Sequence, residues 1–437
     1  MQEKEVIKNV ATNSIWLILE SVIVMTISLV VGVISARFLG PDNYGLINRF
    51  IPFISLANSL CTFGMQSIIT REISKSNSLE YELTVMGSAV GFRFFLSCIA
   101  LILINSYALI VAKDENMSLL AISLIQSISL IFNVYEIFTY WFHARLKSKY
   151  LAISTIITSL VLGIWKIFLL VIKADVLMFA CSTTLQSLLM FMLVFLFFKS
   201  NVKLKLKREQ QVTKVLIKDS YHMLLTSLGV AIYGQIDKIM IGAQLGNKEL
   251  GYYTAAYTLA TIWYFIPQAI SNSMRSVIFS SVNNETDYSK KTRLLYFITI
   301  LLGMCAGIGF QIVGKFLIGI LFGSEYLGAE KALYVLGWVG LFANVGTVKS
   351  IWLVGKGLQK YTKYFTIGGA VINVVMNYFM IRLLGIVGAA IATVVSQIFV
   401  QIVFPLFIKE CRGAVFDMVK CFTAIKDFKN IKNYIKK

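Results

Sequence analysis

The sequence lacks the short motifs by which nucleotide-driven pumps and hydrolases are commonly recognised. It contains no GxxxxGK[ST] phosphate-binding loop, no HExxH zinc motif and no GxSxG nucleophile turn. The absence of a phosphate-binding loop excludes transport powered by nucleotide hydrolysis within this chain. The two histidines, His143 and His222, are isolated near the ends of apolar segments, where an interfacial position is expected rather than ligation. We predict no metal site and no bound cofactor.

Cysteine and charged side chains are also scarce. The six cysteines show no CxxC pair and no disulfide spacing, so we expect them to fill apolar space; they are Cys61, Cys98, Cys181, Cys305, Cys411 and Cys421. Charged residues make up 14% of the chain, 57% of the side chains are hydrophobic, and the mean hydropathy is +0.75. Soluble domains carry about 25% charged residues. The composition therefore excludes a soluble protein and indicates a polytopic membrane protein.

Apolar segments of about the 20-residue length that spans a hydrocarbon core as a helix occur twelve times. They cover residues 12–36, 45–70, 84–111, 117–141, 151–172, 176–198, 216–243, 251–281, 294–316, 330–354, 362–383 and 386–408. The sequence therefore predicts an all-α fold of about twelve transmembrane helices, six in each half. The segment 251–281 is long enough to include an interfacial stretch.

The net charge of +19 is distributed unevenly along the chain. Of the 41 Lys and Arg residues, 27 lie in the two termini and the alternate loops on one side of the predicted spans, and 6 lie in the loops on the other side. Because Lys and Arg are enriched in cytoplasmic loops, we expect both termini in the cytoplasm. The basicity then reflects topology and contact with anionic lipids, and a nucleic-acid partner is not expected.

The turn between the first two segments, residues 36–45, has a counterpart 206 residues later. Each copy is a Leu-Gly pair followed by a glycine five residues on; the residues are Leu39, Gly40 and Gly45, and Leu245, Gly246 and Gly251. Because glycine accepts positive φ, we expect a short hairpin between two helices at each copy. Further along the offset becomes 211, at which Trp141 matches Trp352 and Arg145 matches Lys356. The chain is interpreted as a duplication of two similar halves.

This duplication predicts four parts of the chain. They are a six-helix lobe over 1–198, a basic cytoplasmic linker over 199–215, a second six-helix lobe over 216–408, and a basic tail over 409–437. The linker is interpreted as a solvated connector held against anionic headgroups. The tail places Phe416, Val419, Phe422, Ile425 and Phe428 at helical spacing, which predicts an amphipathic helix lying on the membrane surface.

Several ionisable residues fall inside the predicted spans, where each charge costs roughly 2.5 to 3.5 kcal/mol. The basic candidates are Arg49, Arg93, Lys166, Arg275 and Lys349, and the acidic candidates are Glu20, Glu136 and Asp237. Such residues line a cavity or extend their charge to the membrane interface. The interfacial alternative applies to Arg49, Glu136, Arg275 and Lys349, whereas Arg93 lies too deep for it; Asp237 could instead pair locally with Lys238.

Polar residues also recur every seven positions in the first span, at Ser14, Ser21, Ser28 and Ser35. Seven residues are close to two helical turns, so these serines lie on one stripe that faces other helices or water. Close packing between helices is the simpler interpretation of this stripe.

The excess of Arg and Lys among the buried charges favours an anionic substrate, because guanidinium groups form bidentate, charge-assisted bonds with phosphate oxygens. An enzyme is not expected, since the predicted outward loops are short and the longest, residues 315–329, offers only Glu325 as an acid. Two six-span halves of the same orientation with charges between them suit alternating-access transport.

Three stretches of the chain carry a family resemblance. They are residues 36–45 (ARFLGPDNYG), residues 237–253 (DKIMIG running into LG and LGYY), and residues 384–393 (LGIVGAAIAT). In order, within a duplicated twelve-span chain, they resemble the polysaccharide or O-antigen flippases of the multidrug/oligosaccharidyl-lipid/polysaccharide exporter superfamily. The resemblance implies a V-shaped two-lobed bundle in the bacterial inner membrane. It also implies movement of an undecaprenyl-diphosphate-linked oligosaccharide from the cytoplasmic to the outer leaflet.

The sequence is therefore expected to encode a lipid-linked oligosaccharide flippase. Arg93 and Arg49 are the expected ligands of the diphosphate or of acidic sugars, and Lys166, Arg275 and Lys349 extend the basic cavity. Glu20, Glu136 or Asp237 would couple transport to a proton or sodium gradient. The polysaccharide polymerase machinery is an expected partner. The alternatives are a cation-coupled multidrug exporter of the same superfamily and a membrane-embedded polymerase or glycosyltransferase.

Overall fold

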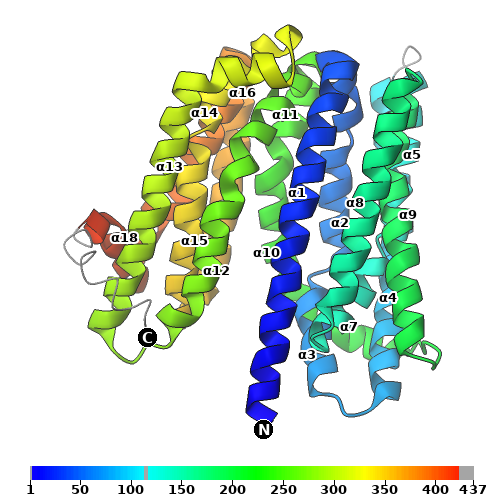
Figure 1. Ribbon diagram of the computed structural model, residues 1–437, viewed down its shortest axis with the longest axis vertical. Coiled ribbons are helices and arrows are strands. Elements are labelled where there is room, and N and C mark those ends of the chain that lie inside the picture. The colour runs from blue at the N-terminus through cyan, green and yellow to red at the C-terminus, as the bar shows by residue number, and fades with distance from the viewer. Residues whose placement is uncertain (1, 113–116, 423–437) are drawn as a thin grey trace. The chain divides into compact units, whose positions relative to one another are not determined.

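The computed structural model describes residues 2–112 and 117–422, with side chains from Trp16 onward apart from residues 17, 18, 222 and 226 (Figure 1). Over these residues the chain forms helices and contains no strand. It divides into two compact units, unit 1 (Met1–Gln235) and unit 2 (Ile236–Lys437). The two units are considered separately below.

Unit 1 contains nine complete helices and the first part of a tenth in its described residues. They are α1 (Gln2–Asn48), α2 (Ile51–Thr62), α3 (Met65–Lys75), α4 (Leu79–Ala112), α5 (Met117–Ser127), α6 (Ser129–Phe132), α7 (Tyr135–Ala144), α8 (Ser148–Val171), α9 (Val176–Asn201) and the first part of α10 (Gln210–Gln244).

Unit 2 begins within α10 and continues through further α-helices joined by short 3-10 and π-helical segments. They are α11 (Asn247–Thr261), η2 (Ile262–Tyr264), α12 (Phe265–Phe279), α13 (Glu285–Leu321), η3 (Ser324–Ala329), α14 (Glu330–Leu336), α15 (Val339–Gly355), η4 (Gln359–Tyr361), α16 (Thr362–Ile398), the π-helix η5 (Phe399–Val403), α17 (Phe404–Phe407), η6 (Lys409–Cys411) and α18 (Arg412–Val419).

Nine helical stretches among the described residues are long and apolar enough to cross a membrane. Two of them, Leu19–Lys75 and Gln359–Phe407, each contain two of the predicted spans. The predicted span 251–281 is helical but is not among the nine; a 3-10 turn at Ile262–Tyr264 lies between its two helices, α11 and α12. All twelve predicted segments are therefore mainly helical, which agrees with an all-α membrane fold.

The repeated Leu-Gly turns are backbone features of the structure. Gly40 has a φ of 71°, Gly246 of 90° and Gly385 of 60°, a region that favours glycine. The second glycine of each predicted hairpin behaves differently, because Gly45 and Gly251 lie inside helices and are buried. The first glycine of each predicted hairpin therefore makes the turn, as expected, and the second lies buried within the helix that follows.

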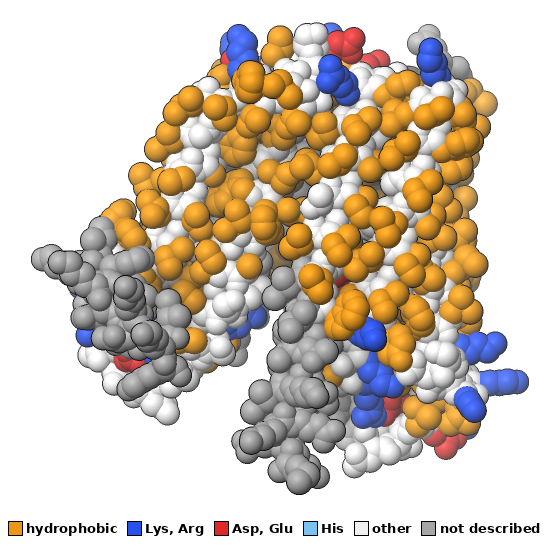
Figure 2. All heavy atoms as spheres, in the orientation of Figure 1, with side chains coloured by type: hydrophobic (Ala, Val, Ile, Leu, Met, Phe, Trp, Pro, Cys, Tyr) orange, Lys and Arg blue, Asp and Glu red, His pale blue; other side chains and the backbone are white. Residues whose placement is uncertain are grey.

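The surface of each unit separates apolar flanks from charged ends. Figure 2 shows hydrophobic side chains covering the flanks of the helices, while Lys and Arg side chains gather near helix ends. Exposed large side chains include Ile102, Leu103 and Ile110 on α4 and Ile164 and Val171 on α8, each at least 62% exposed. Apolar surface of this extent requires a lipid environment, because soluble proteins do not leave it in water.

The basic linker packs against unit 1. Helix α9 continues to Asn201 and α10 begins at Gln210, so the non-helical linker is shorter than the predicted 199–215. Ser88 of α4 donates to Glu209 O at 3.2 Å and accepts from Glu209 N at 3.0 Å. Gly87 leaves room for the linker backbone, since a Cβ there would lie 2.2 Å from Lys207 O. The linker is thus docked on α4.

The predicted tail helix is present in its first part. Helix α18 exposes Phe416 by 54% and Val419 by 65%, and Phe422 just beyond it by 55%. These three residues lie at the spacing of one helical face, as expected for an amphipathic segment. The prediction for Ile425 and Phe428 lies outside the described residues.

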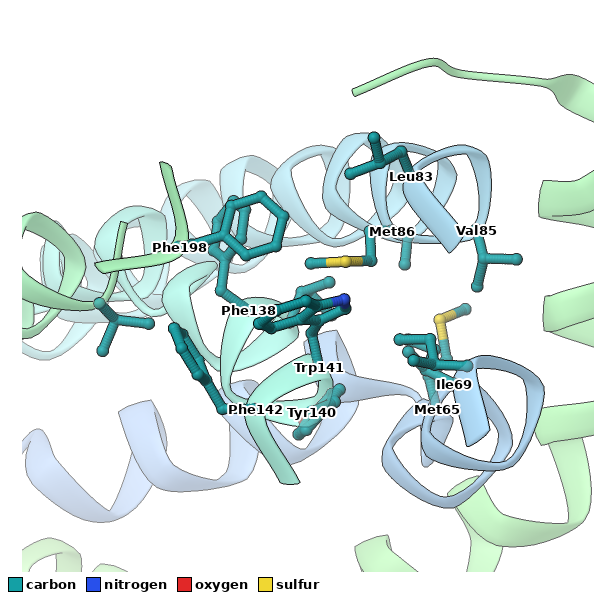
Figure 3. Packing of buried hydrophobic residues seen from close by; sticks show 14 of the residues in the cluster. Met65, Ile69, Leu83, Val85, Met86, Phe138, Tyr140, Trp141, Phe142 and Phe198 are labelled. Atoms are coloured by element: carbon teal, nitrogen blue, oxygen red, sulfur yellow. The ribbon is translucent and has the colours of Figure 1, made fainter. Parts of the chain in front are cut away.

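The matched tryptophans occupy similar environments in the two units. Trp141 of α7 packs among Phe138, Phe142 and Met86 in the apolar core of unit 1 (Figure 3). Its indole donates to Glu82 Oε2 at 2.9 Å, and Glu82 also pairs with Arg145.

In unit 2 the same arrangement is built from other residues. Trp352 of α15 donates to Asp417 Oδ2 at 3.1 Å, and Arg293 of α13 donates to Asp417 Oδ1 at 2.8 Å. The carboxylate here comes from α18, whereas in unit 1 it comes from α4. Both units therefore contain a tryptophan, a carboxylate and an arginine in this arrangement, but only the tryptophan comes from matching positions of the two halves.

Candidate functional site

Arg93 of α4 lies at the centre of a polar cluster inside unit 1. Its guanidinium donates to Glu136 Oε2 at 3.0 Å and to Asn58 Oδ1 at 2.9 Å, and 1% of its side chain is exposed. Asn58 also donates to Glu136 Oε1 at 3.0 Å, so the cluster joins α2, α4 and α7. Pairing with good hydrogen bonds is what makes a buried charge tolerable. Arg93 and Glu136 therefore neutralise each other here, and their roles in binding and coupling stay predictions.

Lys166 of α8 faces a cavity of about 260 Å³ within unit 1. The cavity is lined by residues of α1, α7, α8 and α9: Val24, Ile27, Ser28, Val31, Tyr135, Thr155, Thr158, Ser159, Leu162, Gly163, Lys166, Gln186 and Met190. Lys166 is half-buried and makes no ion pair or hydrogen bond with any described residue. Lys166 is the charged residue in this lining; the other lining side chains are apolar or carry a hydroxyl or amide group.

Glu20 and Arg49 lie at other levels of unit 1. Glu20 of α1 is half-buried beside Thr155 of α8, with which its carboxylate forms a hydrogen bond. Arg49 is half-buried at the bend between α1 and α2, where its charge interacts with Tyr107 of α4. Neither residue belongs to the lining of the Lys166 cavity.

Asp237 of α10 is buried in unit 2, with 3% of its surface exposed. Its carboxylate accepts a hydrogen bond from the Tyr253 hydroxyl of α11 and another from Lys238 N at 2.9 Å. Thr393 of α16 lies near the Tyr253 hydroxyl, and its own hydroxyl donates to Ala389 O at 3.0 Å. The Lys238 ammonium lies 4.4 Å from the centre of the Tyr257 ring. The DKxxIG and LGYY stretches of the sequence thus meet around one buried carboxylate.

Lys349 of α15 is also buried, with 4% of its surface exposed. Its ammonium donates to Val400 O at 2.7 Å and lies 4.9 Å from the centre of the Phe365 ring. Val400 belongs to the π-helix η5, in which the regular α-helical hydrogen-bond ladder is interrupted. Lys349 thus satisfies a carbonyl of this segment in the structure, and its predicted role in a basic cavity stays a prediction.

Arg275 of α12 is exposed and makes no ion pair or hydrogen bond with the described residues. The eight predicted site residues therefore do not form one cluster within either unit. The structure brings together Arg93 and Glu136, and it places Lys166, Glu20, Arg49, Asp237, Lys349 and Arg275 at separate positions.

Sequence reasoning did not select several residues that the structure makes prominent. Asn58 binds both members of the Arg93 pair, Tyr253 binds Asp237, and Thr158 lines the Lys166 cavity. The motif position of Tyr253 was a usable signal. No such signal was present in the sequence for Thr158, because a threonine inside an apolar helix usually donates its hydroxyl to a backbone carbonyl of its own helix. Only the structure shows that the Thr158 hydroxyl has no hydrogen-bond partner.

The helices and the intramembrane charges together define a multi-pass membrane protein with the fold of a transporter. The family described as polysaccharide biosynthesis protein matches residues 10–279, more than half of the sequence, and the chain belongs to this family. The family described as MatE matches residues 223–379. The membership in the polysaccharide flippase family that the three sequence stretches predicted is confirmed.

Similar curated proteins support the same grouping over part of the chain. The probable low-salt glycan biosynthesis flippase Agl15 of Haloferax volcanii is 27% identical over 188 residues, covering 40% of this chain and 38% of that protein. The capsular polysaccharide biosynthesis protein CapF of Staphylococcus aureus is 26% identical over 184 residues, covering 40% and 45%. Each match thus spans less than half of either protein.

Two solved structures show the fold over almost the whole length. The lipid II flippase MurJ in an inward closed conformation has a TM-score of 0.71 at 16% identity, covering 94% of this chain and 92% of that chain. An inward-facing multidrug resistance MATE family transporter has a TM-score of 0.68 at 15% identity, covering 92% and 96%. At this identity the likeness establishes the fold.

Proposed function

We propose that this protein is a flippase that moves a lipid-linked oligosaccharide from the cytoplasmic to the outer leaflet by alternating access. The observation that carries the proposal is Lys166, a cation with no partner among the described residues that faces a polar cavity inside an apolar helical unit. A charged side chain inside a membrane costs free energy, so an unpaired one is better explained by ligand binding than by a contribution to stability. Family membership and relatives named as flippases support the same conclusion.

The proposed substrate is an undecaprenyl-diphosphate-linked repeat unit of an O-antigen, capsule or exopolysaccharide. Its anionic groups are attracted by the intramembrane cations Arg49, Arg93, Lys166, Arg275 and Lys349. Arg275 and Lys166 are the first contacts, because neither has an ion-pair partner among the described residues. Arg93 and Lys349 require their present partners to be released before they contact a ligand.

Coupling to a proton or sodium gradient is assigned to the buried acids. Asp237 is the strongest of the three, because it is 3% exposed and bonds to Tyr253 rather than to a cationic side chain. Glu136 is neutralised by Arg93, and Glu20 is bonded to Thr155. A carboxylate without a paired guanidinium or ammonium is the group that gains most from binding a proton or Na⁺.

The proposed location is the bacterial inner membrane with both termini in the cytoplasm. The distribution of 27 of the 41 Lys and Arg residues on one side of the spans supports this orientation. On that side the protein is expected to contact anionic lipids. The polysaccharide polymerase machinery is a further proposed partner.

A second candidate is a cation-coupled multidrug exporter. The match of residues 223–379 to the MatE family and the fold likeness to MATE transporters favour it. The cavity argues against it, because a binding site for cationic drugs is better served by an acidic or apolar lining than by Lys166. A polymerase or glycosyltransferase is disfavoured by relatives that are named flippases and transporters.

The deciding experiment is reconstitution of the full chain into liposomes with a fluorescent undecaprenyl-diphosphate oligosaccharide. The proposal expects the lipid to become accessible to an external lectin faster with protein than without it, and expects no efflux of a cationic dye. Dye efflux without lipid movement would identify the drug exporter. Lengthening of the glycan would identify a polymerase.

A further inference from the structure

We propose that the Lys166 cavity of unit 1 binds one acidic sugar residue of the oligosaccharide, with the sugar carboxylate against the Lys166 ammonium. The inference rests on the proposed function and adds to it a substrate class and a place for that part of the substrate.

The cavity gathers polar groups that have no partner in the chain. Thr158 is 2% exposed and its hydroxyl has no hydrogen-bond partner. Ser28, Ser159, Lys166 and Gln186 line the same space, and none of them makes a hydrogen bond with a described residue. Thr155, by contrast, is already bonded to Leu151 O at 3.0 Å. Five partnerless polar side chains from α1, α8 and α9 therefore face one space.

Such a concentration is uncommon for a packing interface. Buried hydroxyl, amide and ammonium groups are nearly always hydrogen-bonded, because leaving them bare costs free energy. Serines and threonines that only pack helices together usually bond their own helix, as Thr155 does. Of the groups around this cavity, Thr158 is buried without a partner, Ser159 and Lys166 are half-buried, and Ser28 and Gln186 are exposed. They are open to bond a ligand, which would also supply the counterion of Lys166.

The size of the cavity limits the ligand to about one sugar ring. Its volume of about 260 Å³ lies below the range of roughly 300 to 1,000 Å³ that holds drug-sized ligands. The hydroxyl and amide groups match the hydroxyls of a sugar, and Tyr135 offers a ring face for its C–H side.

The charge of the cavity selects a carboxylate over a diphosphate. Lys166 supplies one compact positive charge, whereas planar guanidinium forks are better suited to phosphate oxygens. Glu20 of α1 lies beside Thr155, a lining residue eleven positions before Lys166 and thus about 16 Å away from it along α8. A single carboxylate therefore meets no opposing negative charge from the lining.

The first test is binding of methyl glucuronide to the full chain in phosphatidylcholine nanodiscs, followed by ligand-observed saturation-transfer NMR. We expect the glucuronide to bind and the neutral methyl glucoside to bind at least 10-fold more weakly. Lys166→Gln is expected to reduce glucuronide affinity at least 10-fold, and Thr158→Val several-fold. Lys166→Arg should retain part of the affinity.

The matched control is Lys173→Gln, which removes one positive charge from an exposed position seven residues further along the same lobe. It should leave glucuronide binding unchanged. Equal binding of glucoside and glucuronide, or equal loss in Lys173→Gln, overturns the inference. So does displacement of the signal by inorganic phosphate or by phosphatidylglycerol added to the nanodiscs, because the site would then hold a phosphate or a lipid headgroup.

A second measurement separates this inference from the proposed function. Liposomes containing the protein receive two undecaprenyl-diphosphate lipids, one with a neutral sugar and one with glucuronic acid. If the wild type prefers the acidic lipid and Lys166→Gln loses the preference while still moving the neutral lipid, the inference stands. If both variants move both lipids equally, the inference fails and the flippase remains. If the wild type moves neither lipid, the proposed function fails, and the glucuronide titration alone decides what the cavity binds.

Discussion

At the scale of single residues, Arg93 and Lys166 differ in what balances their charge. Arg93 is almost completely buried and is held by Glu136 and Asn58, while Lys166 has no partner among the described residues. Removing one member of a buried ion pair leaves the other charge uncompensated and lowers stability. Removing a charge that has no partner eliminates an uncompensated charge and does not lower stability. The same type of substitution should therefore act in opposite directions at the two sites.

The variant Glu136→Ala is expected to destabilise the protein by about 3 kcal/mol or more, because it leaves Arg93 buried without its counterion. Thermal unfolding of the purified protein in detergent measures the effect. The double variant Arg93→Met with Glu136→Met should recover much of the loss, and Lys166→Gln should unfold no earlier than the wild type. An unchanged melting temperature in Glu136→Ala would show that the pair does not hold α4 and α7 together.

At the scale of helices, the chain turns where glycine permits it. Gly246 has a φ of 90° and no atom lies within 4 Å of the place where a Cβ would stand, so a substitution there meets backbone strain without a steric clash. Gly309 has equally open space but lies inside the regular helix α13. Alanine is favoured over glycine in a helix by roughly 1 kcal/mol. At the φ of 90° and ψ of −171° found at Gly246, a region essentially restricted to glycine, alanine is disfavoured by roughly 1 to 3 kcal/mol.

We therefore expect Gly246→Ala to lower the free energy of unfolding by about 1 to 3 kcal/mol and Gly309→Ala to raise it slightly. Thermal unfolding of both variants in the same detergent measures the difference. Equal effects of the two substitutions would mean that the conformation at Gly246 is not needed for the turn between α10 and α11.

Helix α18 supplies the carboxylate that unit 2 uses at Trp352. Asp417→Ala removes the partner of both Trp352 and Arg293, which is expected to cost about 1 to 3 kcal/mol and to loosen α18 from α13 and α15. Limited proteolysis with trypsin should then cut faster at Lys409 and Arg412. Glu410→Ala, an exposed acid on the same segment, is the control and should be cut at the wild-type rate. Equal cutting of both variants contradicts the role of Asp417.

At the scale of the whole molecule, composition and periodicity predicted the membrane class, the helical fold and the positions of the apolar segments. Hydropathy failed where a helix is interrupted without losing its apolar character, as at Ile262–Tyr264, and it gave no sign of the π-helix at Phe399–Val403. Those breaks depend on packing between segments distant in sequence.

The candidate site was predictable only as a set of residue types. An intramembrane charge can be found in a sequence, but its partner cannot: Arg93 is neutralised by a residue 43 positions away, while Lys166 is not neutralised by any described residue. For serine and threonine the sequence indicates a polar stripe, as in the first span, but not whether each hydroxyl is hydrogen-bonded, because the fold decides that.

Transport coupling is a property of the whole protein, and Asp237 allows it to be tested. Asp237→Asn is expected to retain folding but to make lipid movement in liposomes insensitive to an imposed sodium or proton gradient, since an amide cannot bind and release either cation as a carboxylate does. Tyr253→Phe, which removes one hydrogen bond to the same carboxylate, should keep a gradient response of reduced size. A full response in Asp237→Asn would assign coupling to Glu20 or Glu136 instead.

The docking of the linker on α4 and the extent of unit 1 to Gln235 have a consequence for biosynthesis. Unit 1 needs 37 residues beyond the predicted lobe boundary at 198 before its chain is complete. At roughly 5 to 20 residues per second, the ribosome takes about 2 to 7 s to make them. The surface of α4 around Gly87 waits only for Lys207, 9 residues beyond that boundary. Unit 1 itself stays incomplete until the first part of α10 has been made as part of the second half of the chain.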